Sequence, residues 1–368
     1  MAQPGHEEDV RWMQAALALA RRAKGSTFPN PAVGAVVVAR GRPVGAGMTA
    51  PAGGPHAEVR AIARAGRKAA GATLYVTLEP CCHQGRTGPC TEAILRAGIR
   101  RVVAAVRDPN PLVAGRGLAA LRRAGVSVEC GLCSDDARRL NEDFFRWVTR
   151  RAPWVSLKLA MTLDGRIADT DGASRWISSA ASRRLVHQLR RTHAAVAVGR
   201  GTLVRDDPSL TVRHVAGPSP ARVVFAAGAV PRSSRFVRTA AGARSIVVRP
   251  GGVAGRRRVR PDRVEVWETG TRDRVSMVRA FCRMAYAQGL PSVLVEGGQG
   301  MAESFLEAHV VNRLYVFYGP KVLGQGLEGL RFGSGLRVGR CIGLDRVEMR
   351  RLGDDLMVSG IVRYPGRK

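Results

Sequence analysis

The chain has 368 residues, 45% of them hydrophobic, which is enough for about two domains that each bury a core. A formal net charge of +30 ordinarily indicates a nucleic-acid partner. Here 54 of the 59 basic residues are arginine and they are spread over every segment, so the charge is weak evidence for such a partner. No apolar run reaches the length of a membrane span and the first residues are polar and acidic, so we expect neither a membrane helix nor a secretory leader.

The first stretch predicts an amphipathic helix from about Glu8 to Lys24, with acidic residues in its first turn and basic residues in its last. Gly25 ends this helix, and a strand from about Val33 to Ala39 turns back into a second strand. Asn30 lies between two prolines in the connecting loop. It is either a turn former or a substrate contact, and the sequence leaves both interpretations open.

The next stretch, from His56 to Cys90, carries residues of a metal site. HAEVRAIARAG predicts a helix, ATLYVTL a strand that leads to Cys81, and TEAILRAG a second helix. The imidazole of His56 and the thiolates of Cys81 and Cys90 suit a zinc ion whose fourth position stays open. Glu58 is close enough to act on water there without being a ligand, and His-x-Glu followed by Pro-Cys is typical of zinc-dependent base deaminases. Eight residues separate the two cysteines, which departs from the usual C-x-x-C spacing.

Other polar residues of this loop have less direct roles. Cys82 is adjacent to Cys81 and is expected to face elsewhere. His83 fits a contact to a substrate or to a ligand better than a place on the metal. Pro89 is expected in the first turn of the following helix, which places Cys90 at a helix N-terminus that favours a thiolate.

The rest of this half alternates strands and helices, which predicts a layered α/β domain. One helix, SDDARRLNEDFFRWV, is expected to close it with Ser134 as its cap. Cys130 and Cys133 have no second cysteine pair and no histidine near them in the sequence, so we interpret them as structural. We place a domain boundary at Arg150–Arg151–Ala152–Pro153, which divides the chain into domains at residues 1–150 and 151–368.

The second half restarts the alternation with WVSLKLAMTLDGRIA, a strand with one buried face. SRWISSAASRRLVHQLRR predicts a helix capped by Ser178 or Ser179, and a further helix is expected near Arg272 to Gln288. GRGTLVRDDPSLTVR is expected to be a loop that carries the paired acids Asp206 and Asp207. Strands are predicted at AAVAVG, ARVVFAA, RSIVV and RVEVWE.

A glycine-rich turn follows the next strand in SVLVEGGQGMAESFLEAHV. Backbone N–H groups and a helix dipole after such a turn can hold a phosphate, although a tight turn alone also explains the glycines. The turn lacks the G-x-G-x-x-G spacing, so it does not predict a standard dinucleotide fold. RVEMRRLGDDLMVSGIVRY predicts two last strands joined by a Gly-Asp turn.

Several of these segments together resemble a known family. In order, they are PNPAVGAVVV, HAEVRAI, TLEPCCHQGRTGPC, DPNPLVAGRG, KLAMTLDGRIA, SRWISS, DDPSLTVR and VEGGQGM. The chain is similar over nearly all of its length to the bifunctional riboflavin-biosynthesis deaminase–reductases. The long PCCH…GPC loop is particular to that family and accounts for the spacing of the two cysteines.

The resemblance implies an α/β cytidine-deaminase-like three-layer domain at residues 1–150 and a dihydrofolate-reductase-like domain at 151–368. The first would deaminate 2,5-diamino-6-(5-phosphoribosylamino)pyrimidin-4(3H)-one by zinc-dependent hydrolysis. The second would reduce the ribosyl side chain to ribityl with NADPH. Carried over by position, His56, Cys81 and Cys90 would hold zinc and Glu58 would be the catalytic proton shuttle.

The resemblance also assigns residues to the reductase. Contacts to NADP would come from Ala160, Trp176, Thr202, Asp206, Gly298, Gly300 and Ser304. Contacts to substrate would come from Lys158, Ser174, Arg190, Leu210, Arg213 and Glu296. From the residues alone, Arg190 and Arg213 suit a phosphate through bidentate hydrogen bonds but also an ordinary charged surface. Trp176 likewise suits a core position.

One segment departs from the family. After the strand VVF an acidic residue and a hydroxyl residue are usual, and this chain has Ala226 and Ala227. A cofactor contact there is lost or made by the backbone, so we leave this segment out of the predicted site.

Two other functions compete with the bifunctional enzyme. A nucleic-acid base deaminase would share the zinc chemistry but leave the second half unexplained, and ammonia release from single-stranded DNA would reveal it. A non-catalytic zinc module would need a fourth ligand. We expect a phosphorylated pyrimidine as substrate, a homo-oligomer, no specific nucleic acid, no membrane and a cytoplasmic location, where cysteine and histidine clusters bind metal more often than they form disulfides.

Overall fold

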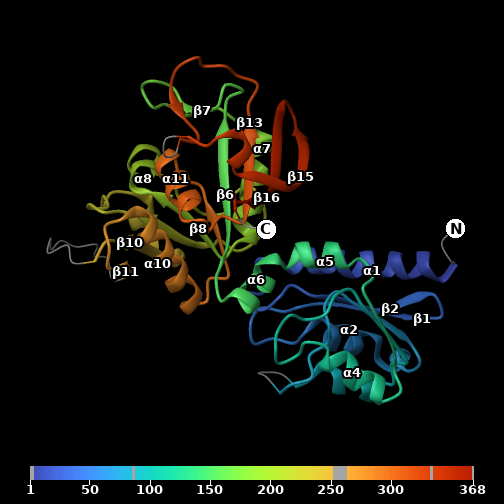
Figure 1. The fold of residues 1–368 in the computed structure, drawn as a ribbon. Helices are drawn as coiled ribbons and strands as arrows, with labels where there is room; N and C mark the ends of the chain where they lie inside the picture. The colour runs from blue at the N-terminus through green and yellow to red at the C-terminus, as the bar shows by residue number, and fades with distance from the viewer. Residues whose placement is uncertain (1–3, 85–87, 252–262, 332–334, 367–368) are drawn as a thin grey trace. The chain divides into compact units, whose positions relative to one another are not determined.

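The computed structural model describes residues 4–84, 88–251, 263–331 and 335–366 (Figure 1). The chain divides into two compact units, Met1–Arg151 and Ala152–Lys368. Each unit has its own hydrophobic core.

The first unit is built on one mixed sheet. Within the described residues this sheet has five strands in the order β2-β1-β3-β4-β5. Strand β1 pairs antiparallel with both β2 and β3, and β3, β4 and β5 run parallel. The strands are β1 (Gly34–Ala39), β2 (Arg42–Met48), β3 (Thr73–Val76), β4 (Arg101–Ala104) and β5 (Ser127–Cys130). The helices are α1 (Pro4–Ala23), α2 (Ala57–Ala65), the 3-10 turn η1 (Gly66–Ala69), α3 (Cys90–Arg96), α4 (Arg116–Arg123), α5 (Ser134–Leu140) and α6 (Glu142–Arg150).

Helices cover both faces of this sheet, and glycines set how closely they approach. A Cβ on Gly34 of β1 would lie 1.9 Å from the Ala16 carbonyl oxygen of α1. A Cβ on Gly47 of β2 would lie 2.3 Å from the Ala57 carbonyl oxygen of α2. Because Gly47 pairs with the residue after Gly34 and strand residues alternate between faces, α1 and α2 lie on opposite sides. The predicted three-layer arrangement is therefore confirmed (Figure 1).

The segment that closes the first unit is two helices rather than the single helix predicted. The break falls at Asn141, whose side chain is buried and bonds to the backbone of Ala32, accepting from its N–H and donating to its carbonyl, each at 2.9 Å. Ser134 is also not a cap, because Cys133 precedes α5 in a left-handed conformation and no side chain caps this end. The hydrophobic pattern could not reveal Asn141, since its partner lies 109 residues earlier.

The second unit contains a larger sheet. Its described residues form nine strands in the order β11-β10-β9-β8-β12-β6-β13-β16-β15, with β7 and β14 as a separate pair. The strands from β11 to β13 run parallel, and β16 and β15 add an antiparallel edge. The strands are β6 (Trp154–Met161), β7 (Arg166–Ala168), β8 (Ala195–Gly199), β9 (Ala221–Phe225), β10 (Ser245–Arg249), β11 (Val264–Glu268), β12 (Ser292–Val295), β13 (Arg313–Tyr318), β14 (Leu327–Glu328), β15 (Gly343–Leu352) and β16 (Asp355–Arg363).

Alternating side chains of the central strands build a core on each face of this sheet. Ala195 and Ala197 of β8 belong to the core that contains Phe281 and Phe305, from α10 and α11. Val196 between them belongs to the core on the other face. The helical segments are α7 (Ala180–Thr192), α8 (Arg200–Asp206), α9 (Arg235–Arg238), η2 (Ala240–Gly242), α10 (Arg274–Ala287), α11 (Gln299–Glu307) and η3 (Val338–Arg340).

Two local features of this unit bear on the sequence predictions. Ser179 caps α7 by accepting the N–H of Ser182, which decides between the two predicted caps. The stretch expected to be a loop with paired acids begins instead as the short helix α8, and only residues from Asp207 onward are irregular. In the described part of the chain, no helix is both long enough and apolar enough to cross a membrane.

Candidate active sites

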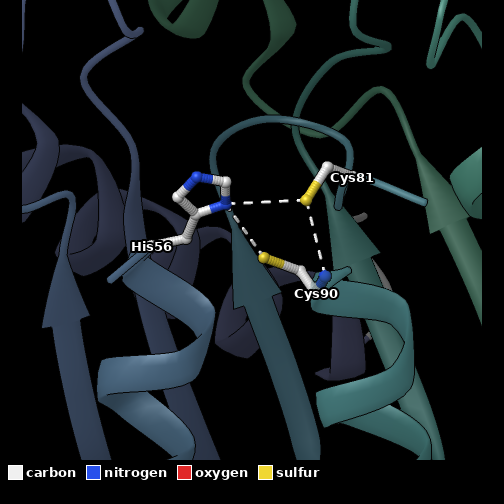
Figure 2. A group of neighbouring side chains, drawn as sticks. All are labelled: His56, Cys81 and Cys90. Carbon is white, nitrogen blue, oxygen red and sulfur yellow. Dashed lines mark hydrogen bonds between the residues drawn. The ribbon is translucent and has the colours of Figure 1, made fainter. Parts of the chain in front are cut away.

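Three side chains of the first unit form a cluster with metal-ligand chemistry. His56 Nδ1 lies 3.2 Å from Cys90 Sγ and 3.5 Å from Cys81 Sγ (Figure 2). In addition, the Cys90 backbone N–H donates to Cys81 Sγ at 3.4 Å. The ligand atoms all lie within 4.8 Å of one another.

Three different elements bring these residues together. His56 is the N-cap of α2, Cys81 follows strand β3, and Cys90 is the first residue of α3 (Figure 2). Pro89 is the N-cap residue of α3, one position before the helical turn where it was predicted. The α3 N-terminus therefore directs a backbone N–H at the Cys81 sulfur, which favours a thiolate there.

The geometry of the cluster fits zinc. Nitrogen and sulfur ligands of a tetrahedral zinc ion stand about 3.5–3.8 Å apart, because the bond lengths are about 2.0–2.3 Å. The two nitrogen–sulfur distances lie close to that range. A hydrogen bond from the Cys90 thiol lowers the pKa of Cys81, and the same bond raises the pKa of Cys90. One thiolate is thus already favoured, and the described residues offer three ligands, which leaves a fourth position for water.

Glu58 lies beside this cluster without belonging to it. It is the second residue of α2 and only 4% exposed. Burial raises the pKa of Glu58 to about 7. A carboxyl group that gains and loses a proton near neutral pH is suited to general acid–base work, and a cation held nearby would favour its ionised form.

Glu79, two residues before Cys81, holds a stretch of backbone that runs from the end of β4 into α4. Its buried carboxylate accepts four backbone N–H groups, from Asp108, Gly115, Gly117 and Leu118, at 2.9–3.2 Å. Each oxygen takes two of these bonds. The carboxylate thus ties the segment just before Cys81 to the start of α4.

Replacing this carboxylate should destabilise the first unit. In Glu79→Gln one oxygen becomes an NH₂ group that faces backbone donors, so we expect a loss of about 1–3 kcal/mol in the free energy of unfolding. Chemical denaturation followed by tryptophan fluorescence would measure it. Glu129→Gln removes an exposed carboxylate of the same unit and is the control. A Glu79→Gln variant as stable as this control would contradict the proposed role.

A cavity of about 430 Å³ opens beside the cluster. Asn30 and His83 both line it, as do His56, Glu58 and Cys81, so the position of Asn30 favours its interpretation as a substrate contact. Cys82 faces away, with its thiol directed at the Leu112 carbonyl 4.0 Å distant. The other described residues of the lining are Pro29, Pro31, Val33, Thr49, Gly53, Gly54, Leu78, Glu79, Asp108, Asn110, Val113 and Phe144.

The second unit contains a separate cavity of about 370 Å³. It brings together most of the residues that the resemblance assigned to the reductase. Those lining it are Lys158, Ala160, Ser174, Trp176, Arg190, Thr202, Asp206, Leu210, Arg213, Glu296 and Gly298. Gly300 and Ser304 do not line it and lie on α11, where the Ser304 hydroxyl donates to the Gly300 carbonyl at 2.7 Å.

A buried ion pair lies at this second cavity. Arg190 of α7 donates twice to Glu296, at 2.6 and 2.9 Å, and the side chains are 11% and 7% exposed. Burial would raise the pKa of Glu296, but Arg190 outweighs it and holds that pKa below the usual value. Burial lowers the pKa of Lys158, with Arg190 adding to the effect and Glu296 opposing it. The sequence left open the possibility that Arg190 is an ordinary surface charge, and its burial excludes this interpretation.

Trp176 is not a core aromatic. It is 59% exposed at the cavity, and the guanidinium of Arg183 lies 4.2 Å from its ring centroid. Such cation–π stacking limits the freedom of an exposed indole. Ala226 is buried in the core, so its side chain makes no polar contact in place of the residues usual in the family.

The sequence predictions missed several residues of the second cavity. His187, Arg205, Asp207, His214 and Arg235 all line it. Burial lowers the pKa of His187 to about 4, and its Nδ1 accepts the Arg213 backbone N–H at 3.1 Å, so it is a neutral imidazole. His187 lies three residues before Arg190, so helical spacing could have placed both on one face of the predicted helix.

Comparison with known proteins agrees with this division. Residues 6–106 match the model described as the cytidine and deoxycytidylate deaminase zinc-binding region. Residues 153–358 match the RibD C-terminal domain. The first unit thus has the fold of a deaminase-type zinc domain, with a cluster that could hold the metal, and is joined to a second domain of a different class. The chain belongs to the riboflavin biosynthesis protein RibD family.

Relatives match over nearly the whole chain. Riboflavin biosynthesis protein RibD of Aquifex aeolicus is 43% identical over 96% of this chain and 98% of its own. The crystal structure of a diaminohydroxyphosphoribosylaminopyrimidine deaminase/5-amino-6-(5-phosphoribosylamino)uracil reductase from Thermotoga maritima is 37% identical, with a TM-score of 0.86 over 98% of this chain and 99% of that one. Acinetobacter baumannii RibD is 34% identical, with a TM-score of 0.85 over 97% and 99%. Both predicted domain folds are confirmed.

Proposed function

We propose that this chain carries out two successive steps of riboflavin biosynthesis, a deamination and a reduction. It is a two-domain enzyme with a deaminase domain and a reductase domain, and its cofactors are zinc and NADPH. One observation carries the proposal: a single chain holds a metal-ligand cluster beside a buried glutamate and, in its other unit, a cavity lined by many cationic side chains.

The deaminase substrate that we propose is 2,5-diamino-6-(5-phosphoribosylamino)pyrimidin-4(3H)-one. His56, Cys81 and Cys90 would hold zinc, which when bound supplies a Lewis acid that makes water easier to ionise. Glu58 would take a proton from the attacking water and deliver one to the departing amine. The cavity beside the cluster is large enough for a pyrimidine ring, and Asn30 and His83 are available to contact it.

The reductase would act on the ribosyl side chain of the deaminated product. NADPH supplies the hydride when bound. Ala160, Trp176, Thr202, Asp206 and Gly298 are proposed to contact it, together with Gly300 and Ser304 from the first turns of α11. Lys158, Ser174, Arg190, Leu210, Arg213 and Glu296 are proposed to contact substrate. The guanidinium of Arg213, at the cavity wall, suits the substrate phosphate.

One coupled assay tests both steps. We propose that residues 1–150 carry the deaminase and residues 151–368 the reductase. With the diaminopyrimidine phosphate as substrate, ammonia release is expected to precede NADPH oxidation, and the pre-deaminated substrate should oxidise NADPH without releasing ammonia. Ammonia release from single-stranded DNA would instead favour a nucleic-acid base deaminase. If neither the diaminopyrimidine phosphate nor single-stranded DNA releases ammonia, the first domain would be interpreted as a non-catalytic zinc module.

We also propose a homo-oligomer in the cytoplasm, without a specific nucleic-acid partner. Exposed apolar side chains on the edge strand β15, such as Val347 at 47% and Met349 at 72%, support an interface with a second copy. Light scattering after size exclusion is expected to give a mass above that of one chain at micromolar concentration. A single-chain mass under those conditions would rule the oligomer out. Duplex DNA binding should vanish near physiological salt.

A further inference from the structure

One wall of the second cavity is residues 206–213, the last residue of α8 and the irregular backbone after it, which we call the cavity loop. Asp206, Asp207, Ser209, Leu210 and Arg213 of this loop all line the cavity. Two of them have the left-handed backbone that side chains seldom adopt, Asp207 at φ 40° and Leu210 at φ 55°. Such a conformation persists only where the surrounding structure holds it.

Side chains at the cavity hold part of this loop. Arg175 donates to the Asp206 carbonyl at 2.7 Å, and Arg190 donates to the Thr211 carbonyl at 3.1 Å. Both arginines themselves line the cavity, so substituting either one would confuse loop position with direct contact to a ligand.

Arg222 of β9 holds the loop from behind. Its side chain is fully buried and is not part of the cavity lining. Nη1 donates to the Ser209 carbonyl at 3.3 Å and to Thr239 Oγ1 at 2.8 Å. Nη2 donates to the Phe236 carbonyl at 3.0 Å and to Ser245 Oγ at 2.6 Å. One guanidinium thus joins the cavity loop to α9, to the residue after α9 and to β10.

This arrangement is costly for the fold. Among the described residues no carboxylate pairs with Arg222, and burial alone lowers its pKa. Its Nε–H also has no hydrogen-bond partner in the described structure. A buried charge with only neutral partners loses solvation that it does not fully recover. An apolar side chain in the same space would give the folded state a more favourable free energy. The buried arginine is therefore best explained by its bonds to the loop.

The same bonds also fix α9 against the loop. The Arg235 backbone N–H, at the start of α9, donates to Asp207 Oδ1 at 2.7 Å. Arg222 bonds to the carbonyl of the next residue, Phe236. The cavity loop and the first turn of α9 are therefore held in register at two points, and Arg213 of the loop and Arg235 of α9 both line the cavity.

We infer that Arg222 is a positioning residue of the reductase, which acts on the phosphorylated substrate through the Ser209 carbonyl and the cavity loop. The inference rests on the reductase function proposed above. It predicts that loosening Arg222 weakens substrate binding more than it slows turnover at saturation, because the side chain never touches the reacting atoms.

The test measures reductase kinetics of the full chain with Arg222→Lys, which keeps the charge but cannot span four acceptors. We expect the KM for the pre-deaminated substrate to rise at least fivefold, with kcat within about threefold and the deaminase rate within about twofold of wild type. Ser245→Ala is the matched control, because it removes an acceptor from Nη2 and leaves the Ser209 bond to Nη1. It should lower the melting temperature and leave the KM unchanged.

A second variant allows the inference to be tested even if Arg222→Lys does not fold. Thr239→Val retains the guanidinium, frees Nη1, the nitrogen that also holds Ser209, and removes the bond from the Thr239 hydroxyl to the Arg235 carbonyl of α9, so we expect a KM rise of about threefold. An unchanged KM in the folded Arg222 or Thr239 variant would overturn the inference. A KM that rises in Ser245→Ala together with a fall in its melting temperature would also overturn it, because loss of stability alone would then explain the effect. Wild-type protein without reductase activity would refute the proposed function instead.

Discussion

Glu58→Gln is expected to lower deaminase turnover by at least about a hundredfold while the purified protein keeps its zinc. Deamination requires one proton to leave the attacking water and one to reach the departing amine. Glu58 is buried beside the cluster, and we propose that its carboxyl group makes both transfers. Glutamine has nearly the same shape but cannot accept the proton. The three ligand side chains are unchanged, so metal binding should persist.

The same variant tests whether the two halves work independently. Each unit has its own core, so reductase activity on pre-deaminated substrate should stay within about twofold of wild type. Glu92→Gln, an exposed change on α3, is the control and should leave both activities unaltered. A Glu58→Gln enzyme that deaminates at the wild-type rate would remove this residue from the mechanism. A folded variant with a failed reductase would show that the halves depend on each other.

Most of the fold could be predicted because its signals are local. Apolar runs and alternating patterns located the strands, and Ser179 could be proposed as a cap from its place before an apolar-periodic stretch. The predictions failed where a distant residue decides the backbone. Asn141 divides one apparent helix into two by bonding to Ala32, and no property of the surrounding sequence indicates that partner.

The two sites differ in how far the sequence could predict them. The metal cluster lies within 35 residues of sequence, and its ligand types are chemically distinctive. The second cavity collects side chains from Lys158 to Leu327, which only the folded sheet brings together. Most of the residues that the family resemblance assigned to the reductase line this cavity, yet His187 and the supporting Arg222 were missed. Helical spacing from Arg190 could have indicated His187, but a single arginine is not distinctive in a chain with 54 of them, so the position of Arg222 could be found only from the structure.

The arginines that bias the composition also act inside the fold. Arg190 and Arg222 are both buried, the first paired with Glu296 and the second bonded to neutral oxygens. A delocalised guanidinium carries five donors in a fixed plane and can satisfy more carbonyls at once than the three donors of a lysine. Part of the +30 charge therefore has a structural function, and the net charge is a poor guide to what the molecule binds.

Cys81→Ser is expected to lose zinc, whereas Cys82→Ser should retain it. Cys81 Sγ lies 3.5 Å from His56 Nδ1 and accepts the Cys90 N–H, while Cys82 is directed at a backbone carbonyl on the other side. Loss of a thiolate ligand should weaken zinc binding by more than about a hundredfold, the upper end of what a residue that merely supports a ligand contributes. The neighbouring substitution removes no ligand, so its effect should stay within about twofold.

The measurement is zinc content after purification, followed by competition with a chromophoric chelator, and it needs no enzyme assay. Cys82→Ser serves as the matched control, because it makes the same chemical change one residue away in the same loop. His56 and Cys90 alone cannot hold zinc in a site of this kind, since a catalytic zinc site uses three protein ligands. Equal zinc loss in the two variants would mean that the loop rearranges around the metal. Zinc loss in Cys82→Ser alone would mean that the ligand is the other thiol.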